Sequence, residues 1–284
     1  MADQEKKAKL RSSRPDFASI GGVIVAIGCL LGGLILDGGK VSDVTQITAA
    51  IIVLGGTLGA VMVTSPMSSL FSAVAGFKKI LFEDVVSTEA AIDQIVAYAT
   101  KARKSSLISL EEDLEGIEDP FLKKMLTLAV DGTDLQELRK MIELDLTEAE
   151  RHAEVQAKVF EAAGGYAPTI GIIGAVMGLI QVMKHLENID EVGKGIAIAF
   201  VATVYGVAVS NLFLLPAAGK LRAREQKDMQ LKELFLEGVS AILEGMNPKL
   251  IRIKLEAFVH GSGSKAKAAK AEKGGATAPA EARG

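Results

Sequence analysis

Four stretches of the chain lack charged residues and are long enough to cross a membrane. Phe17 to Leu36 and Val44 to Val63 are continuous apolar runs of about 20 residues, the length that a helix needs to span a bilayer. Residues 168–183 and 195–215 are two further apolar runs, and a short charged loop, 184–194, joins them. The pattern predicts four transmembrane helices, of which the last two form a hairpin with a proline at each open end.

Small residues line one side of each predicted hairpin helix. On the first helix they recur at i, i+3, i+4 and i+7, and they are Gly171, Gly174, Ala175 and Gly178. On the second helix the corresponding series is Ala199, Ala202, Thr203, Gly206 and Ser210. A lipid-facing surface gains nothing from small residues, whereas close approach of another helix, or space for a file of water, requires them. We therefore expect both stripes to face protein and to leave room for a partner.

The segment between the second and third spans, residues 64–167, is too long for a structureless loop. Its apolar residues recur at helical spacing, which predicts several helices. Asp119 precedes Pro120, a residue that fixes the first position of a helix. Thr133, with Gln136 three residues later, fits a capping box for a long charged helix that runs to Ala163.

Beyond Pro216 the pattern predicts a helix to about Glu244, and residues 249–260 mix alternating and helical spacing and are not assigned. The fold class is therefore all-α, a polytopic membrane protein with four transmembrane helices and a helical cytoplasmic domain. The expected segments are a basic cytoplasmic N-terminus (1–16), two spans (17–63), a cytoplasmic helical domain (64–167), a transmembrane hairpin (168–216), a cytoplasmic helical C-terminal region (217–260) and a disordered tail (261–284).

Basic residues near the span ends predict the orientation, because cytoplasmic loops carry an excess of Lys and Arg. The loops expected outside hold few of them, namely Lys40, Lys184 and Lys194. The flanks expected inside hold more, namely Lys6, Lys7, Lys9, Arg11 and Arg14 before the first span and Lys220, Arg222, Arg224 and Lys227 after the fourth. Both termini and residues 64–167 should therefore be cytoplasmic.

Composition excludes several classes of function. The net charge of -3, with no free basic stripe, argues against a nucleic-acid partner. The single cysteine, Cys29, lies in an apolar span and cannot form an intrachain disulfide. We find no phosphate-binding loop, no metal-ligand set and no nucleophile with its base, so we expect no enzyme, no bound metal and no cofactor.

The predicted spans contain no Asp, Glu, Lys, Arg or His. A proton relay through a membrane normally needs a titratable group, so this chain alone is an incomplete conductor. Any carboxylate must come from another polypeptide. Side chains such as Thr203 and Tyr205 hold water by hydrogen bonds but do not titrate near neutral pH. The same absence also fits a purely structural membrane protein.

Two stretches of the hairpin carry a family resemblance. Tyr166-Ala-Pro-Thr-Ile-Gly-Ile-Ile-Gly-Ala-Val-Met-Gly-Leu-Ile180, and Ala199-Phe-Val-Ala-Thr-Val-Tyr-Gly206 with Pro216 ten residues further, resemble the MotA/PomA family of flagellar motor stator subunits. The resemblance covers about residues 17–255, including the four-span layout and the long second cytoplasmic loop. It implies a subunit of the bacterial inner membrane that turns ion flow into rotation.

The resemblance implies roles for seven residues: Pro168 and Pro216 as coupling prolines, Ala175, Thr203 and Tyr205 along the ion path, and Arg103 and Glu111 as contacts to the rotor. It also implies partners: a homo-pentamer around two copies of a MotB-like single-span protein that supplies an intramembrane aspartate, the rotor protein FliG, and membrane lipid. Sodium-driven members usually have a second threonine where this chain has Ala175, so H⁺ is favoured over Na⁺ as the transported ion.

The residues by themselves leave plainer interpretations open. Pro168 also fits the start of a helix and Pro216 the end of one. Arg103 and Glu111 also fit solvated surface charges, and Thr203 also fits a bond to its own helix carbonyl. Two alternative functions remain: an energiser of envelope transport like ExbB and TolQ, which have three spans, and a membrane scaffold without ion flux.

Overall fold

The computed structural model describes residues 11–257 and 259, so most of the predicted basic N-terminus and the predicted disordered tail lie outside the described residues. The predicted all-α fold is confirmed. Two short strands, β1 (Arg11–Pro15) and β2 (Phe82–Val86), pair into a small sheet that was not predicted. Within the described residues, four helical stretches are long and apolar enough to cross a membrane, as expected of a multi-pass membrane protein.

The chain divides into two compact units. We call residues 13–84 and 149–225 the membrane unit, and the described residues of 85–148 and 226–259 the helical domain. Two long helices, α8 (Leu135–Lys184) and α10 (Leu215–Leu243), contribute residues to both units.

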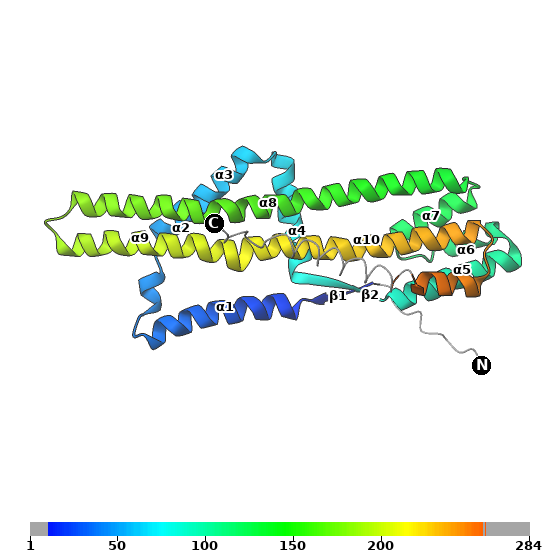
Figure 1. Ribbon diagram of the computed structural model, residues 1–284, viewed down its shortest axis with the longest axis horizontal. Coiled ribbons are helices and arrows are strands. Elements are labelled where there is room, and N and C mark those ends of the chain that lie inside the picture. The colour runs from blue at the N-terminus through cyan, green and yellow to red at the C-terminus, as the bar shows by residue number, and fades with distance from the viewer. Residues whose placement is uncertain (1–10, 258, 260–284) are drawn as a thin grey trace, which may run out of the picture. The chain divides into compact units, whose positions relative to one another are not determined.

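The first two predicted spans correspond to helical segments of the membrane unit (Figure 1). The first is helix α1, Phe17–Leu36, with the same bounds as the predicted apolar run. The second is interrupted by one π-helical turn, and its parts are a 3-10 turn, η1 (Val41–Val44), α2 (Ile47–Ala50), the π-turn η2 (Ile51–Gly55) and α3 (Gly56–Thr64). An amphipathic helix, α4 (Met67–Leu81), follows it.

The third span is the carboxyl-terminal part of a continuous helix. The plainer interpretation of Pro168, as the start of a helix, is wrong, because α8 starts at Leu135 and passes through this proline. The predicted cap, Thr133, is also wrong by one residue: the Asp134 side chain accepts the hydrogen bond from the Gln136 amide, at 2.9 Å. A carboxylate is a better acceptor than a hydroxyl at a helix amino terminus, where it also meets the positive end of the dipole.

The fourth span, α9 (Ile189–Val209), begins earlier than predicted. Asn188 caps it by accepting a hydrogen bond from the Asp190 amide at 3.1 Å, and Asp190 and Glu191 lie in the first turn, where negative charge is favourable. The connection to α8 is therefore only 185–188, shorter than the predicted 184–194. After α9 a π-helical turn, η4 (Ser210–Leu214), leads directly into α10, so the plainer interpretation of Pro216, as the end of a helix, is wrong as well.

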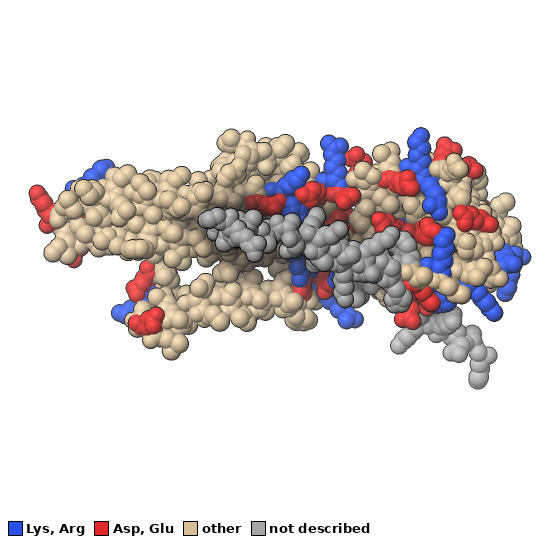
Figure 2. Space-filling model, viewed as in Figure 1, with Lys and Arg blue, Asp and Glu red and all other residues tan. Residues whose placement is uncertain are grey.

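The surface of the membrane unit is apolar over its spans. Figure 2 shows that the visible faces of α1, α9 and the end of α8 carry charged side chains only at their loops. Large apolar side chains are exposed on all of them, among them Ile24 on α1, Ile173 and Met177 on α8, and Phe200 on α9. Exposure of such a large apolar surface to water is unfavourable, so we expect lipid or neighbouring subunits to cover it.

A buried ionic cluster fixes the start of the first span. Asp16 is only 4% exposed; it caps α1 by accepting a hydrogen bond from the Ser19 amide and receives Arg224 Nη2 at 2.5 Å. Lys220 is the second cationic partner of Asp16. The backbone amide of Asp16 donates to the Leu81 carbonyl oxygen at 2.9 Å. The hydrogen bond from Lys220, with smaller contributions from Ser19 and Arg224, holds the pKa of Asp16 well below its ordinary value against the opposing effect of burial.

We expect Asp16→Asn to lower the unfolding temperature of the purified protein by several degrees, because two partly buried cations lose their counter-charge while the cap is kept. A carboxylate whose pKa is depressed in the folded state contributes its full stabilisation above its unfolded pKa of about 4, and this contribution is lost progressively as the pH falls from there through the folded-state pKa. The difference between wild type and variant should therefore be largest above about pH 5 and shrink toward about pH 3. The control is Asp37→Asn at the exposed end of α1, and an equal loss in both variants would contradict the assignment.

The helical domain has one hydrophobic core. It is built by α5 (Thr88–Ser105), α7 (Pro120–Val130), the starts and ends of α8 and α10 that belong to this unit, and a last helix over residues 248–257. Its largest fully buried side chains are Ile95, Leu110, Leu122, Met125, Leu126, Leu138, Ile142, Leu234, Phe235, Ile251 and Leu255. Segments 85–148 and 226–257, assigned to separate regions from the sequence, thus share one core.

Local signals explain how these helices begin and end. Asp119 caps α7 by accepting hydrogen bonds from the amides of Phe121 and Leu122, with Pro120 at the first position, as predicted. The turn after α10 contains Gly245 with a φ of +69°, a conformation that favours glycine. The unassigned residues 249–257 prove helical, since Ile251 and Leu255, four positions apart, both face the core.

Candidate functional site

The two small-residue stripes of the hairpin pack against each other. A Cβ atom added to Gly206 would lie 2.5 Å from the carbonyl oxygen of Ala167, and one added to Gly171 would lie 2.9 Å from that of Ala202. Nearer the loop, a Cβ on Gly178 would lie 2.8 Å from the Ala199 amide nitrogen. The backbones of α8 and α9 are therefore in direct contact along the hairpin, which lacks space for even one methyl group at these positions.

This contact corrects one prediction from the sequence. We expected the stripes to leave room for a partner helix or a file of water, but every stripe residue except Ala175 and Thr203 is buried, and the stripe glycines pack mainly against the other helix of the same hairpin. The spacing indicated close helix packing correctly and did not identify which helix packs there. Any partner must contact other faces of the hairpin, where larger apolar side chains such as Val176, Phe200 and Val204 are exposed.

Ala175 and Thr203 lie beside this packed seam and are partly exposed. The Thr203 hydroxyl donates to the carbonyl oxygen of Ala199 in its own helix at 3.3 Å, which is the plainer of the two interpretations made from the sequence. The bond uses the hydroxyl hydrogen and leaves the oxygen lone pairs able to accept. Ala175 offers no polar atom beyond its backbone.

Tyr205 fastens α9 to the start of the second span. Its hydroxyl donates to the Val44 carbonyl oxygen at 2.6 Å and accepts from the Gln46 amide at 3.3 Å, which satisfies two backbone groups where η1 gives way to α2. Its ring packs on a small buried cluster that includes Ala49 and Val53. The structure thus gives Tyr205 a positional role, and its predicted place on the ion path stays a prediction.

Both prolines lie within continuous helix. Pro168 is half-buried in the middle of α8, and Pro216 is the second residue of α10, directly after the π-turn η4. A helical proline has no amide hydrogen and its ring crowds the preceding turn, so each marks a position where the regular hydrogen-bond ladder is broken. A π-turn beside a proline is one way to relieve that crowding.

Arg222 joins α8 to α10 a short distance beyond the prolines. It donates from Nε and Nη2 to the two carboxylate oxygens of Glu154, both at 2.9 Å, and from Nη2 to Glu161 at 2.6 Å. The fork of the guanidinium matches a carboxylate in this two-bond geometry. No local pattern signals this contact, because Arg222 lies 68 residues from Glu154 and 61 residues from Glu161 in the chain.

The predicted rotor contacts, Arg103 and Glu111, lie at the surface of the helical domain. Arg103 is in the last turn of α5 and Glu111 starts the short helix α6 (Glu111–Leu114), with the 3-10 turn η3 (Leu107–Leu110) between them. Both are exposed, and among the described residues neither has an ion-pair partner. Their charges are therefore available to another protein.

Neighbouring residues hold this loop in place. Lys101 donates to Asp113 at 2.8 Å, which ties α5 to α6, and this hydrogen bond raises the pKa of Lys101. Leu110 is fully buried beneath the loop. The anchoring residues that flank Arg103 and Glu111 are thus paired or buried, while the two predicted contacts are not.

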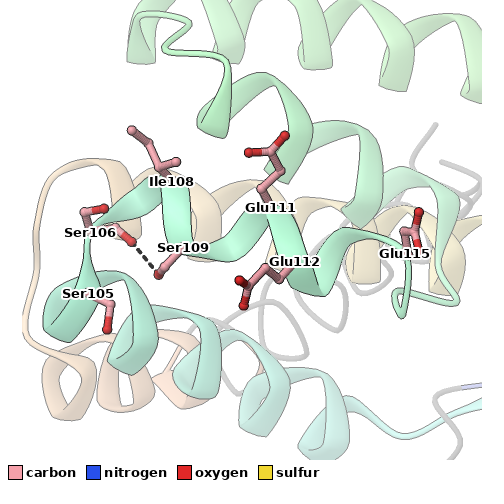
Figure 3. A pocket seen from close by; sticks show the side chains of 7 residues that line it. All are labelled: Ser105, Ser106, Ile108, Ser109, Glu111, Glu112 and Glu115. Carbon is pink, nitrogen blue, oxygen red and sulfur yellow. Dashed lines mark hydrogen bonds between the residues drawn. The ribbon is translucent and has the colours of Figure 1, made fainter.

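Figure 3 shows the depression beside Glu111. Ser106, the one described non-glycine residue with a positive φ (+83°), makes the sharp turn between α5 and η3, and its carbonyl accepts from Ser109 Oγ at 2.7 Å. The carboxyl groups of Glu111 and Glu112 point to opposite sides of α6 (Figure 3). Ile108, 66% exposed, adds an apolar side chain to this otherwise polar surface.

Comparison with known proteins agrees with the layout of the spans and the helical domain. Residues 20–106 match the motility protein A N-terminal family, and residues 113–234 match the MotA/TolQ/ExbB proton channel family. Motility protein A of Bacillus subtilis is 35% identical over 241 residues, which cover 84% of this chain and 89% of that protein. Chemotaxis protein PomA of Vibrio alginolyticus is 30% identical over 245 residues, covering 86% of this chain and 96% of PomA.

Two solved structures have the same fold. The structure of C. jejuni MotAB superimposes with a TM-score of 0.80 and 29% identity, covering 86% of this chain and 95% of the matched chain. The flagellar MotAB stator complex from Bacillus subtilis gives a TM-score of 0.79 and 34% identity, covering 84% and 94%. The chain therefore belongs to the MotA/PomA family, within the MotA/TolQ/ExbB proton channel family.

Proposed function

We propose that this chain is a stator subunit of a bacterial flagellar motor, which forms a proton channel with a MotB partner and converts ion flow into torque. The observation that carries the proposal is its likeness over most of its length to motility protein A and to the MotAB structures. The motility protein A N-terminal match and the four candidate spans favour this function over the three-span ExbB and TolQ energisers.

The charge content of the spans supports a partner that supplies the acid. Residues 162–183 and 195–219 contain no Asp, Glu, Lys, Arg or His, and neither do α1 and residues 47–64. Proton transfer across the membrane requires a titratable group, so the aspartate comes from the single-span partner. Because the seam between α8 and α9 is closed, we place the partner on the exposed side of the hairpin that carries Ala175 and Thr203.

Protons suit this path better than sodium ions. A dehydrated cation needs a shell of oxygen ligands in place of its water. Ala175 supplies no side-chain oxygen, so the Thr203 hydroxyl is the single side-chain oxygen that these two positions offer, fewer than a dehydrated sodium ion needs. The channel is therefore proposed to carry H⁺.

The distribution of basic residues supports the proposed orientation in the bacterial inner membrane. Lys220, Arg222 and Arg224 follow the fourth span, whereas the short 185–188 connection contains no Lys or Arg. In this arrangement both termini, residues 64–167 and residues 217–260 are cytoplasmic, and the hairpin of residues 168–216 crosses the membrane. The exposed charges of Arg103 and Glu111 then face the rotor protein FliG, and five copies of the chain surround two copies of the partner.

Complementation tests the function directly. In cells that lack their own stator, this chain produced with its MotB partner should restore swimming, and the two should purify together with several copies of this chain per complex. Production without the partner should restore nothing. A chain that stays monomeric and never associates with the partner would contradict the proposal.

The predicted rotor contacts are tested in the same cells. Arg103→Glu should reduce swimming severalfold while protein amount and unfolding temperature stay unchanged, because the side chain is exposed and makes no ion pair within the described residues. Lys123→Glu, which reverses an exposed charge on α7, is the matched control and should swim normally. If both variants swam equally fast, the proposal that Arg103 contacts the rotor would be wrong.

A further inference from the structure

Pro168 deprives one backbone carbonyl of its donor. In an α-helix the amide of each residue donates to the carbonyl four residues earlier, and proline has no amide hydrogen. The carbonyl affected in α8 is that of Gly164, which is itself buried. A buried carbonyl without a donor is costly, particularly in a part of the protein that water does not reach.

Ser210 supplies the missing donor from the other helix of the hairpin. Its Oγ lies 2.6 Å from the Gly164 carbonyl oxygen, and the side chain is 1% exposed. A serine or threonine in a membrane helix commonly donates to the carbonyl four residues back in its own helix, as Thr203 does. Ser210 instead donates across 46 residues of sequence to the carbonyl that Pro168 leaves free.

The contact lies where the second proline segment begins. Ser210 is the first residue of the π-turn η4, and Pro216 follows two residues after that turn. A Cβ atom on Gly164 would lie 2.6 Å from Leu215 Cδ2, so the backbone at Gly164 approaches the residue next to Pro216 closely. One hydrogen bond thus connects the break in α8 with the irregular turn before α10.

We propose that Ser210 is a positioning residue that links the two prolines, holding the broken turn of α8 in register with the π-turn of η4. When either segment changes conformation, the bond to Gly164 transmits the change to the other. The inference goes beyond the proposed stator function and rests on it for the consequence to rotation. The bond itself is tested without the motor.

The first experiment is a double-mutant cycle on the purified full-length chain, with Ser210→Ala, Pro168→Ala and the double variant, read as unfolding temperatures in detergent. Ser210→Ala should lower the temperature by about 2 to 4 °C, because the buried carbonyl loses its donor. Pro168→Ala restores a backbone donor for Gly164, so in that background Ser210→Ala should have almost no effect. Additive effects would overturn the proposal, since Ser210 would then not compensate for Pro168.

The second experiment measures rotation with the MotB partner present. Ser210→Ala should lower rotation speed severalfold at an unchanged amount of protein, and Ser210→Thr, which keeps the hydroxyl, should recover most of it. The control, Thr147→Ala, removes a hydroxyl that donates to a carbonyl four residues back in α8, and should rotate at wild-type speed. If the double-mutant cycle shows non-additive effects of Ser210→Ala and Pro168→Ala but Ser210→Ala leaves the rotation speed unchanged, the positioning role is overturned. If the wild-type chain with its MotB partner produces no rotation, the proposed stator function is wrong. The double-mutant cycle still tests the hydrogen bond from Ser210 to Gly164 in that case.

Discussion

Gly206→Ala is expected to abolish swimming and to lower the unfolding temperature of the purified chain by about 6 °C or more. The added methyl group would lie 2.5 Å from the carbonyl oxygen of Ala167 and 3.1 Å from the Cα of Gly171, both backbone atoms of α8. No side-chain rotation relieves such a contact, so the two helices must separate. The measurement is thermal unfolding in detergent, with swimming of cells that carry the variant and its partner.

The matched control is Gly193→Ala on the same helix. Nothing lies within 4 Å of a Cβ added there, and alanine is the better helix former by roughly 1 kcal/mol. Its unfolding temperature should equal or exceed that of wild type. If both variants were equally stable, the direct backbone contact of α8 with α9 would be wrong.

The spans were predictable from sequence because one physical requirement decides them. A run without charged residues and about 20 residues long has few alternatives to crossing a bilayer, and the predicted Phe17–Leu36 matches α1 at both ends. The buried face of α10, with Leu231, Leu234 and Phe235, followed from helical spacing for the same reason. Such local periodic signals need no knowledge of what the segment packs against.

The helix boundaries at the prolines were not predictable. A proline after a charged helix normally marks a new start, yet α8 runs through Pro168. The helix tolerates this proline because Ser210 satisfies the carbonyl of Gly164, and the partner in that bond is 46 residues away. The cluster of Asp16 with Lys220 and Arg224 was missed for the same reason, since its members come from opposite ends of the chain.

Some features of the candidate sites were predictable from local sequence patterns, and others were not. The exposure of Arg103 and Glu111 was foreseeable from their charged surroundings. The closed seam of the hairpin was foreseeable only in part: the stripes predicted close packing, and the choice between a partner's helix and the neighbouring helix required the structure. Which face of the hairpin meets the partner is consequently inferred from exposure of Ala175 and Thr203 and not from their spacing.

We expect motor rotation driven by this chain to depend on the proton gradient and to stop when the MotB partner is absent. The apolar parts of the spans, residues 17–36, 47–64, 162–183 and 195–219, contain no titratable carboxylate, so the chain alone should conduct no protons in vesicles. With the partner, a single carboxylate suffices for protons, whereas sodium needs several oxygen ligands that Ala175 does not provide. Proton conduction should be almost completely lost without the partner, because the chain then has no titratable group to carry protons across the membrane.

Swimming speed against sodium concentration, with and without a protonophore, is the most direct test of the proposal that this chain powers rotation with protons. The cells lack their own stators and carry this chain with its MotB partner. We expect a speed that is independent of sodium and lost on adding the protonophore. A speed that rises with sodium and survives the protonophore would contradict it.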